Sequence, residues 1–370
     1  AEVLTEVEPP VGVELAEDAL VDHASSVLGE RIATGAQERL AREVPGLLRE
    51  PEVRQRIGAL FQQNLPFGVF HFAHQRGDLL NNRQGDLKRR RIIVLLRGVV
   101  ELSVQVFECL SKPAKLGLPV IVLDRPNPTG HTRAEGRSLD PEFRSFVGLE
   151  PMPIRHALTM AEVLDWRRSV EGLPREALHI LKVRGLTRDV EAPACDRPFV
   201  MPSPNMPDYL TARVYPGGCL LEGTNLSEGR GTTRPFEILG APFLDGEKLA
   251  KDVSALNLPG FSLRPLSFRP MFQKHAGLDC GGVYVHVTSP AFRPVATYAA
   301  LIACARQQAP DAFRFRTERY EFRDDVPALD LLCGGPYVRE AMMAGESPRA
   351  IAEYLSSVSD DTWNQARLYE

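Results

Sequence analysis

The amino-acid sequence predicts a mixed α/β protein of two domains. Its 370 residues, 44% of them hydrophobic, exceed the size at which single cores usually stop growing. All eight tyrosines and both tryptophans lie from Trp166 onward, so the composition changes along the chain. Strand-like and helix-like segments alternate in the second half, which is typical of mixed α/β folds. We therefore expect one domain over residues 1–165 and a second α/β domain over residues 166–370.

The first 115 residues are the atypical part of the first domain, because they are rich in Arg and Leu and lack Tyr and Trp. Residues 34–37 fit a capping box at the start of a helix that Pro45 interrupts. The apolar run at 92–96 predicts a buried strand, and residues 102–116 predict a broken helix.

A short apolar strand is predicted next, and it ends in a polar loop that contains Asp124, Arg125 and Asn127. Ligands gather at the carboxyl ends of strands in open parallel sheets, so these three residues are candidates for substrate binding. Asp124 and Asn127 fit equally an Asx-type turn, in which their side chains only cap local backbone.

A second capping box, Thr159 to Glu162, predicts a helix with an apolar stripe. Arg155 and His156 lie just before this helix, where anions are favoured, and they are further candidates for substrate binding. A histidine in such a position is also commonly a hydrogen-bonded structural residue.

The second half yields three further elements. Residues 282–288 alternate in the manner of a strand, with three valines on the core face and His286 on the other. His286 could line a cleft, or it could be a half-buried histidine with satisfied hydrogen bonds. Asp245 can cap one helix, and Pro294 can open another.

The most polar loop follows an apolar run within residues 219–236. Gly223, Gly229 and Gly231 permit sharp turns or the close approach of a ligand. An ordinary exposed turn needs fewer special residues than this loop contains, so we expect it to bind a ligand. The candidate binding residues in and near it are Glu222, Thr224, Asn225, Arg230 and, in a proline-rich segment upstream, Asn205.

Composition excludes several classes of protein. A net charge of −4 and a pI near 6.1 argue against nucleic-acid binding, despite the basic cluster at residues 89–91. No apolar run reaches the 18 or so residues of a membrane span. The six cysteines have no metal-site spacing, so buried thiols are expected, and no motif indicates a metal or a cofactor.

Cellular location and assembly follow less directly from the sequence. The sequence starts without an initiator Met, which is compatible with removal of a leader and a periplasmic or secreted location; otherwise a cytoplasmic location is expected. No feature fixes an oligomeric state.

Several long segments, in the same order, resemble the exo-β-N-acetylmuramidases, a bacterial family long known as a domain of unknown function. The resemblance runs from about residue 116 to about residue 335. It rests on Val120-Ile-Val-Leu-Asp124-Arg-Pro-Asn127-Pro, Leu139-Asp-Pro-Glu-Phe-Arg-Ser-Phe146-Val-Gly, Pro153-Ile-Arg155-His156, Pro202-Ser-Pro-Asn205-Met-Pro, Tyr215-Pro-Gly and Glu222-Gly-Thr-Asn225-Leu-Ser-Glu-Gly-Arg230-Gly-Thr-Thr.

The resemblance implies a Rossmann-like first domain without a nucleotide role and a smaller α/β second domain. It also implies release of N-acetylmuramic acid (MurNAc) from the non-reducing end of peptidoglycan fragments such as MurNAc–GlcNAc, in cell-wall turnover. MurNAc carries a lactyl carboxylate, an acetamido group and hydroxyls. Arg230 or Arg155 would then bind the carboxylate, and Asn205 and Asn225 the acetamido group or hydroxyls.

The chain departs from the family in its first 115 residues, where the family's Pro-Glu-His-Gly segment is missing. The glutamate of that segment is the family's leading candidate for the general acid, so the catalytic residue here is unknown, with Glu222 and Asp124 as the available carboxylates. Three explanations stay open: a diverged first domain, an inactive sugar-binding relative, or a shifted reading frame over residues 1–115.

Overall fold

The computed structural model describes residues 92–94, 110–111, 114, 119–190, 199–356, 365 and 367–370. All of them belong to one compact unit, Pro66–Glu370. Within these ranges the predicted mixed α/β fold is confirmed, with two separate sheets. The helices predicted from residue 34 and over 102–116 lie outside the described residues, apart from positions 110, 111 and 114. Residues 1–115 are otherwise described only at 92–94, so the structure does not test their reading frame.

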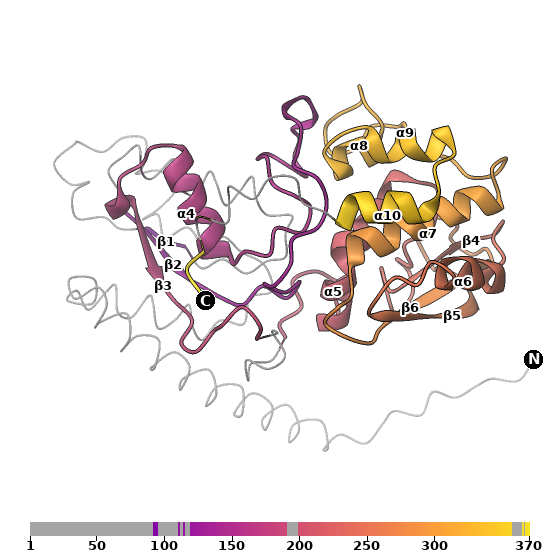
Figure 1. Cartoon of the computed structure of the whole chain (residues 1–370), viewed down its shortest axis with the longest axis horizontal. Helices are drawn as coiled ribbons and strands as arrows, with labels where there is room; N and C mark the ends of the chain where they lie inside the picture. Colours follow the sequence, from indigo (N-terminus) through magenta and orange to yellow (C-terminus); the bar gives the residue numbers. More distant parts are fainter. Residues whose placement is uncertain are drawn as a thin grey trace, which may run out of the picture. The chain divides into compact units, whose positions relative to one another are not determined.

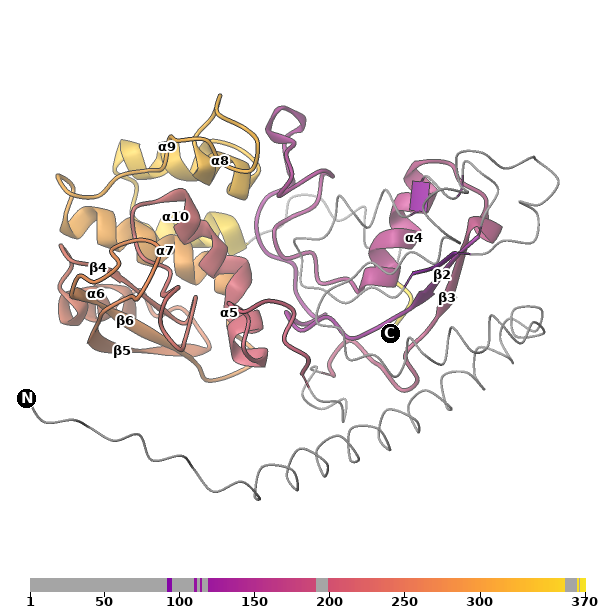
Figure 2. The same ribbon diagram turned by 180° about the vertical axis from the view of Figure 1, so that it is seen from behind.

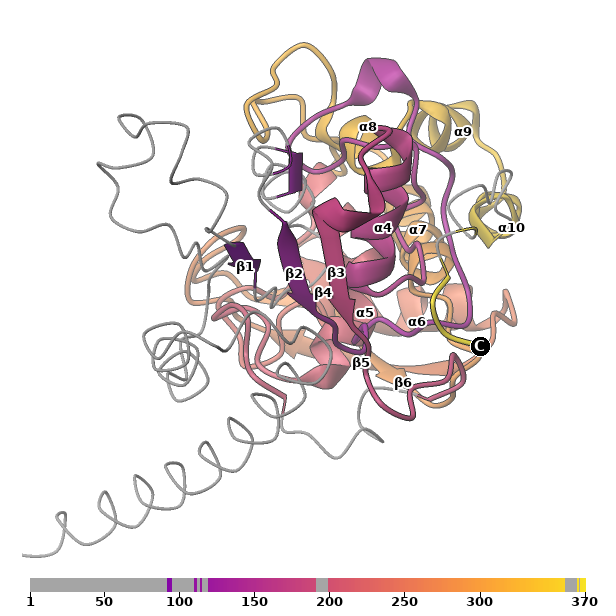
Figure 3. The same cartoon turned by 90° about the vertical axis from the view of Figure 1, so that its left-hand side faces the viewer.

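The first sheet is parallel, with strand order β1-β2-β3 (Figure 3). Its strands are β1 (Ile92–Val94), β2 (Val120–Leu123) and β3 (Leu178–Leu181), and the first two fall where the sequence predicts strands. Helix α4 (Met160–Val170) connects β2 to β3 and packs against the sheet, with its Leu164 in one apolar cluster with Val120 and Val122. Short 3₁₀ turns η3 (Pro141–Phe143) and η4 (Arg175–Ala177) complete this region.

The predicted capping box is confirmed at the start of α4. The Thr159 hydroxyl accepts a hydrogen bond from the Glu162 amide, and the Glu162 carboxylate accepts one from the Thr159 amide. Both amides would otherwise lack a partner at the helix start.

The second sheet is antiparallel, with strand order β4-β6-β5 (Figure 2). Val283 and Val285 of β6 are buried in the core as predicted. The elements of this region are α5 (Tyr209–Gly218), η6 (Cys219–Gly223), β4 (Ile238–Ala241), α6 (Gly246–Ser254), β5 (Phe261–Phe268), β6 (Cys280–Val287), α7 (Pro294–Gln308), α8 (Ala328–Cys333), α9 (Tyr337–Ala344) and α10 (Pro348–Ser356).

Helix α7 is the centre of this second region. It is apolar around most of its surface and packs against α5, α6 and α10 (Figure 1). Such all-round burial is typical of a helix in the middle of a core. The predicted helix starts are also confirmed, because Asp245 accepts hydrogen bonds from two amides of α6 and Pro294 is the first residue of α7.

A buried ion pair joins the segment between β2 and α4 to the start of α7. Arg155 Nη1 lies 2.5 Å from Glu135 Oε1, and the Val295 amide donates to Glu135 Oε2 over 3.1 Å. Both charged side chains are almost completely buried. Glu135 therefore neutralises a buried arginine and also caps a helix in another part of the chain.

Residues 367–370 return to the carboxyl edge of the first sheet. Tyr369 Oη donates to Asp124 Oδ2 over 2.6 Å and accepts from the Val183 amide over 2.9 Å. The Arg188 amide donates to the Glu370 carbonyl. The chain thus covers part of the edge at which a ligand was expected.

Two expectations concern the chain as a whole. The four cysteines within the described ranges are buried and form no disulfide, whereas Cys109 and Cys195 lie outside them. No helix among the described residues is long and apolar enough to cross a membrane.

Candidate functional site

Turn η6 and the loop that follows it carry a compact group of charged side chains. Glu222 Oε1 accepts a hydrogen bond from Arg230 Nη2 over 2.7 Å, and Glu228 Oε1 lies 3.2 Å from Arg230 Nε. Lys274 Nζ lies 3.0 Å from Glu228 Oε2. The side chains of Glu222 and Arg230 are 14% and 24% exposed, so both are partly accessible to a ligand.

Lys274 belongs to the segment between β5 and β6 and holds this loop from outside it. Its ammonium group donates to the carbonyls of Leu221 and Leu226. Burial lowers the pKa of Lys274, while the neighbouring Glu228 carboxylate opposes that effect. The predicted loop is therefore fixed by a partner about 50 residues away that the sequence pattern did not reveal.

Tyr320 is the second residue that sequence reasoning missed. Its hydroxyl donates to Glu222 Oε2 over 2.9 Å, so both carboxylate oxygens of Glu222 have a donor. The guanidinium of Arg316 lies 4.9 Å from the Tyr320 ring centroid. Arg230 and Lys274 thus contact the two carboxylates, and Arg316 is a third cation, near enough to Lys274 to help lower its pKa. An excess of positive charge favours an anionic ligand.

The glycines of the loop are needed for its shape, as predicted. Gly229 and Gly231 have φ of +74° and +83°, which side chains rarely adopt. A Cβ atom at Gly231 would lie 2.7 Å from the Phe272 amide nitrogen, and one at Gly223 would lie 2.7 Å from the Leu329 backbone. Here the glycines allow other backbone, rather than a ligand, to approach closely.

Thr224 and Asn225 lie in the same loop but point their polar atoms into the protein. Asn225 Nδ2 donates to the Ala312 carbonyl, and its Oδ1 accepts from the Arg314 amide. The Thr224 hydroxyl donates to the Leu221 carbonyl. Contact of these two side chains with a substrate stays a prediction, and the geometry gives it no support.

The Asp124 loop is likewise bonded internally. Asp124 accepts hydrogen bonds from Thr159 Oγ1, the Ala161 amide and Tyr369 Oη, and burial raises its pKa despite these donors. Asn127 accepts from the Thr129 amide, which is the Asx turn considered above. Arg125 is half-buried. The first turn of a helix favours a negative charge, and at the start of α4 the protein's own Asp124 carboxylate supplies it.

Arg155 and His156 lie side by side in the sequence but differ in their surroundings. Arg155 is 2% exposed, and it donates to the Thr129 carbonyl and to Glu135. A lactyl carboxylate could reach it only by displacing Glu135. The His156 ring accepts from the Leu158 amide, and burial lowers its pKa to about 4. His156 is therefore neutral at physiological pH.

The last two candidates, Asn205 and His286, are half-buried. The His286 ring lies 4.0 Å, centroid to centroid, from Tyr284, whose hydroxyl donates to Glu237 Oε2. Burial raises the pKa of Glu237. A small cavity of about 60 Å³ is lined by Glu237, Tyr284 and His286, but it is too small for a sugar ring.

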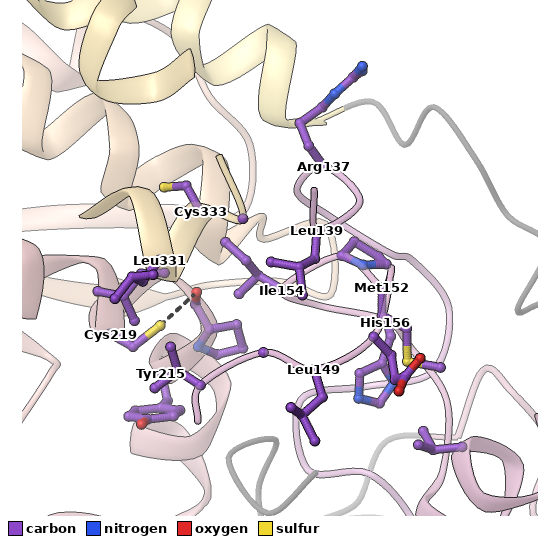
Figure 4. A pocket seen from close by; sticks show the side chains of 18 of the residues that line it. Arg137, Leu139, Leu149, Met152, Ile154, His156, Tyr215, Cys219, Leu331 and Cys333 are labelled. Atoms are coloured by element: carbon purple, nitrogen blue, oxygen red, sulfur yellow. Dashed lines mark hydrogen bonds between the residues drawn. The ribbon is translucent and has the colours of Figure 1, made fainter. Parts of the chain in front are cut away.

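A larger cavity, of about 120 Å³, lies elsewhere and is mainly apolar (Figure 4). Leu139, Met152, Ile154 and Cys219 line it, and Arg137 extends away from them. Of the sequence-predicted binding residues only His156 contributes to its wall. Such a lining suits apolar groups better than a carboxylate-bearing sugar. Among the described residues, no cluster of His, Cys, Asp or Glu is placed to hold a metal ion.

Two family models match the chain. Residues 103–210 match the N-terminal domain, and residues 213–367 the C-terminal domain, of the exo-β-N-acetylmuramidase NamZ. The predicted domain boundary at 165/166 stays a prediction. Residues 1–102 lie outside both matches.

A curated relative and two solved structures are similar to the chain. The peptidoglycan β-N-acetylmuramidase NamZ of Bacillus subtilis strain 168 is 39% identical over 232 residues, which are 62% of this chain and 54% of that protein. The chain thus spans about half the length of this relative. Two DUF1343 family proteins of Bacteroides fragilis NCTC 9343 share the fold at 23% identity, with TM-scores of 0.66 and 0.54 over 75% and 78% of each chain.

Proposed function

Because the chain belongs to the NamZ exo-β-N-acetylmuramidase family, we propose that it releases MurNAc from the non-reducing end of peptidoglycan fragments. The observation that carries this proposal is the charged group around Glu222 and Arg230. It combines a partly exposed carboxylate with an excess of positive charge, which suits a sugar that bears hydroxyls and a lactyl carboxylate. Cell-wall turnover would be the setting of such an activity.

We assign the roles of the binding residues within this group. Glu222 accepts a hydrogen bond from a ring hydroxyl or takes up a proton, and Tyr320 orients it through the hydrogen bond to Oε2. Arg230, Lys274 and Arg316 attract the lactyl carboxylate. Arg155 is not assigned this role, because its guanidinium is buried against Glu135.

The general acid has no assigned residue. Glycoside hydrolysis needs a carboxylic acid that protonates the leaving oxygen and a second group that acts as base or nucleophile. The Pro-Glu-His-Gly segment is missing from this sequence, and both Glu222 oxygens already accept hydrogen bonds. These two observations favour a second candidate function, which is binding of MurNAc-containing sugars without turnover.

We propose a Rossmann-like first domain for the region around the parallel sheet. Its support is the β2–α4–β3 unit, in which a helix connects two neighbouring parallel strands. The ligand-binding edge of such a sheet is here occupied by Tyr369, which agrees with a domain that has no nucleotide role.

The proposal is tested with purified protein and the disaccharide MurNAc–GlcNAc. Release of MurNAc, followed by chromatography, is expected from the wild type and should be lost in Glu222→Gln. Tyr320→Phe should weaken binding by about tenfold, since it removes one hydrogen bond to a charged group. Glu353→Gln, on the exposed face of α10, is the matched control and should behave as the wild type.

Calorimetric titration separates the two candidate functions. Saturable binding without release of MurNAc would support the binding protein and reject the enzyme. A folded protein that neither binds nor cleaves the disaccharide would reject both.

A further inference from the structure

Two exposed phenylalanines lie at the tips of two tight turns, one of which begins at Tyr320, the hydrogen-bond partner of Glu222. Phe322 is 74% exposed and Phe146 is 37% exposed. Their ring centroids are 5.7 Å apart and the rings meet edge to face. The two residues come from distant parts of the chain, so the pair depends on the tertiary fold. We call it the aromatic pair.

Both turns are closed by backbone hydrogen bonds. The amide of Tyr320 donates to the Arg323 carbonyl, and the amide of Arg323 donates to the Tyr320 carbonyl. Ser145 and Gly148 bond to each other in the same reciprocal way around Phe146. Each turn therefore presents its phenylalanine at a fixed place.

The turn at Phe322 adopts an unfavourable backbone. Glu321 and Phe322 have φ of +44° and +70°, the conformation of a type I′ turn. Asn and Gly are the usual residues there, because a larger side chain is strained at positive φ. Since Phe322 is mostly exposed, burial does not compensate for that strain. Strained residues that persist without a packing reason are concentrated at functional sites.

The position of this turn connects it to the charged group. Tyr320, at its base, is 4% exposed and donates to Glu222. Arg323, on the other side of the turn, donates to the Arg144 carbonyl over 2.8 Å and so fixes the turn to the segment that carries Phe146. One rigid hairpin thus carries both a hydrogen-bond partner of Glu222 and an exposed ring.

We propose that Phe146 and Phe322 form a stacking subsite for the neutral sugar next to MurNAc, the N-acetylglucosamine on the leaving-group side. This inference rests on the proposed function. MurNAc carries the carboxylate and suits the cationic group, whereas N-acetylglucosamine is uncharged and presents one apolar ring face and an acetamido methyl. An aromatic surface binds such a face by apolar burial. Exposure of the pair to solvent leaves room for a glycan that continues beyond the disaccharide.

The test compares binding of MurNAc–GlcNAc and of MurNAc alone by calorimetric titration. Phe322→Ala should weaken disaccharide binding by about tenfold and leave MurNAc binding unchanged, since an aromatic contact contributes on that order. Met343→Ala is the control and should change neither, because Met343 is also a large exposed apolar residue, 59% exposed on α9.

Two further variants separate the effect of the aromatic ring on binding from the effect of the backbone conformation on stability. Phe322→Gly should raise the melting temperature, because glycine relieves the positive φ, and should still lose disaccharide affinity. Glu321→Asn should raise the melting temperature and keep the affinity of the wild type.

Three results would overturn the subsite: an unchanged disaccharide affinity in Phe322→Ala, an equal loss for MurNAc alone, or the disaccharide affinity of the wild type in Phe322→Gly. A wild type that binds neither sugar would instead reject the proposed function on which the subsite rests. The first three results leave that function intact.

Discussion

Replacement of Glu135 by Gln should destabilise the protein far more than the loss of an ordinary surface charge. The carboxylate and Arg155 are 1% and 3% exposed, so the arginine cannot turn to water when its partner loses its charge. Breaking a buried pair by removing one charge costs about 3–5 kcal/mol. At about 2–4 °C per kcal/mol for a domain of this size, the melting temperature should fall by roughly 6–20 °C.

The same pair contributes little net stability when it is intact. Burial raises the pKa of Glu135 even though the Arg155 guanidinium and two amides of α7 oppose that effect. Its desolvation therefore offsets most of the attraction between the charges. A double variant, Glu135→Leu with Arg155→Met, should recover much of the loss seen in Glu135→Gln.

Thermal unfolding followed by calorimetry and by intrinsic tryptophan fluorescence, to which Trp166, buried in α4, contributes, measures these changes. Asp279→Asn is the matched control, because its pair with Arg269 lies in solvent, and its melting temperature should equal that of the wild type. If Glu135→Gln melts within 2 or so degrees of this control, or if the double variant recovers nothing, the reasoning about the buried pair is refuted.

Three further changes probe other parts of the structure. Gly231→Ala should destabilise by about 1–3 kcal/mol, because its φ is positive and the new Cβ would meet the Phe272 backbone; an unchanged melting curve would contradict this. Burial lowers the pKa of His156 from 6.5 to about 4, so the stability that its neutral ring contributes is fully present above pH 6.5 and is lost as the pH falls through 4. The free energy of unfolding, measured in urea titrations, should fall by up to about 3 kcal/mol over this range, and His156→Gln should lack this pH dependence. Tyr369→Phe should cost about 1–3 kcal/mol, because the buried Asp124 carboxylate loses a donor; the same unfolding free energy as the wild type in urea would argue against that role.

Local signals in the sequence predicted the secondary structure well where it is described. The capping box at Thr159, the cap at Asp245 and the first residue of α7 at Pro294 each depend on neighbours within four residues. The alternation that placed Val283 and Val285 in the core is equally local.

The availability of a polar side chain depends on partners far away in the sequence. Asn225 looked like a ligand-binding amide. Its side-chain Nδ2 and Oδ1 atoms, however, form hydrogen bonds with backbone groups 87 and 89 residues downstream. Tyr320 reaches Glu222 from 98 residues away, and no spacing pattern encodes such a contact. The sequence could therefore identify the loop around Glu222, but it could not tell which of its side chains were already occupied.

The bond between Asp124 and Tyr369 has a consequence for synthesis of the protein. The two residues are 245 positions apart, and the whole antiparallel sheet with its helices lies between them in the sequence. At about 5–20 residues per second, a ribosome needs roughly 12–50 s to travel from one to the other. During that interval the carboxyl edge of the parallel sheet lacks its cover, and the second sheet is completed first. We expect the nascent chain to expose this edge to chaperones until Tyr369 has left the ribosome.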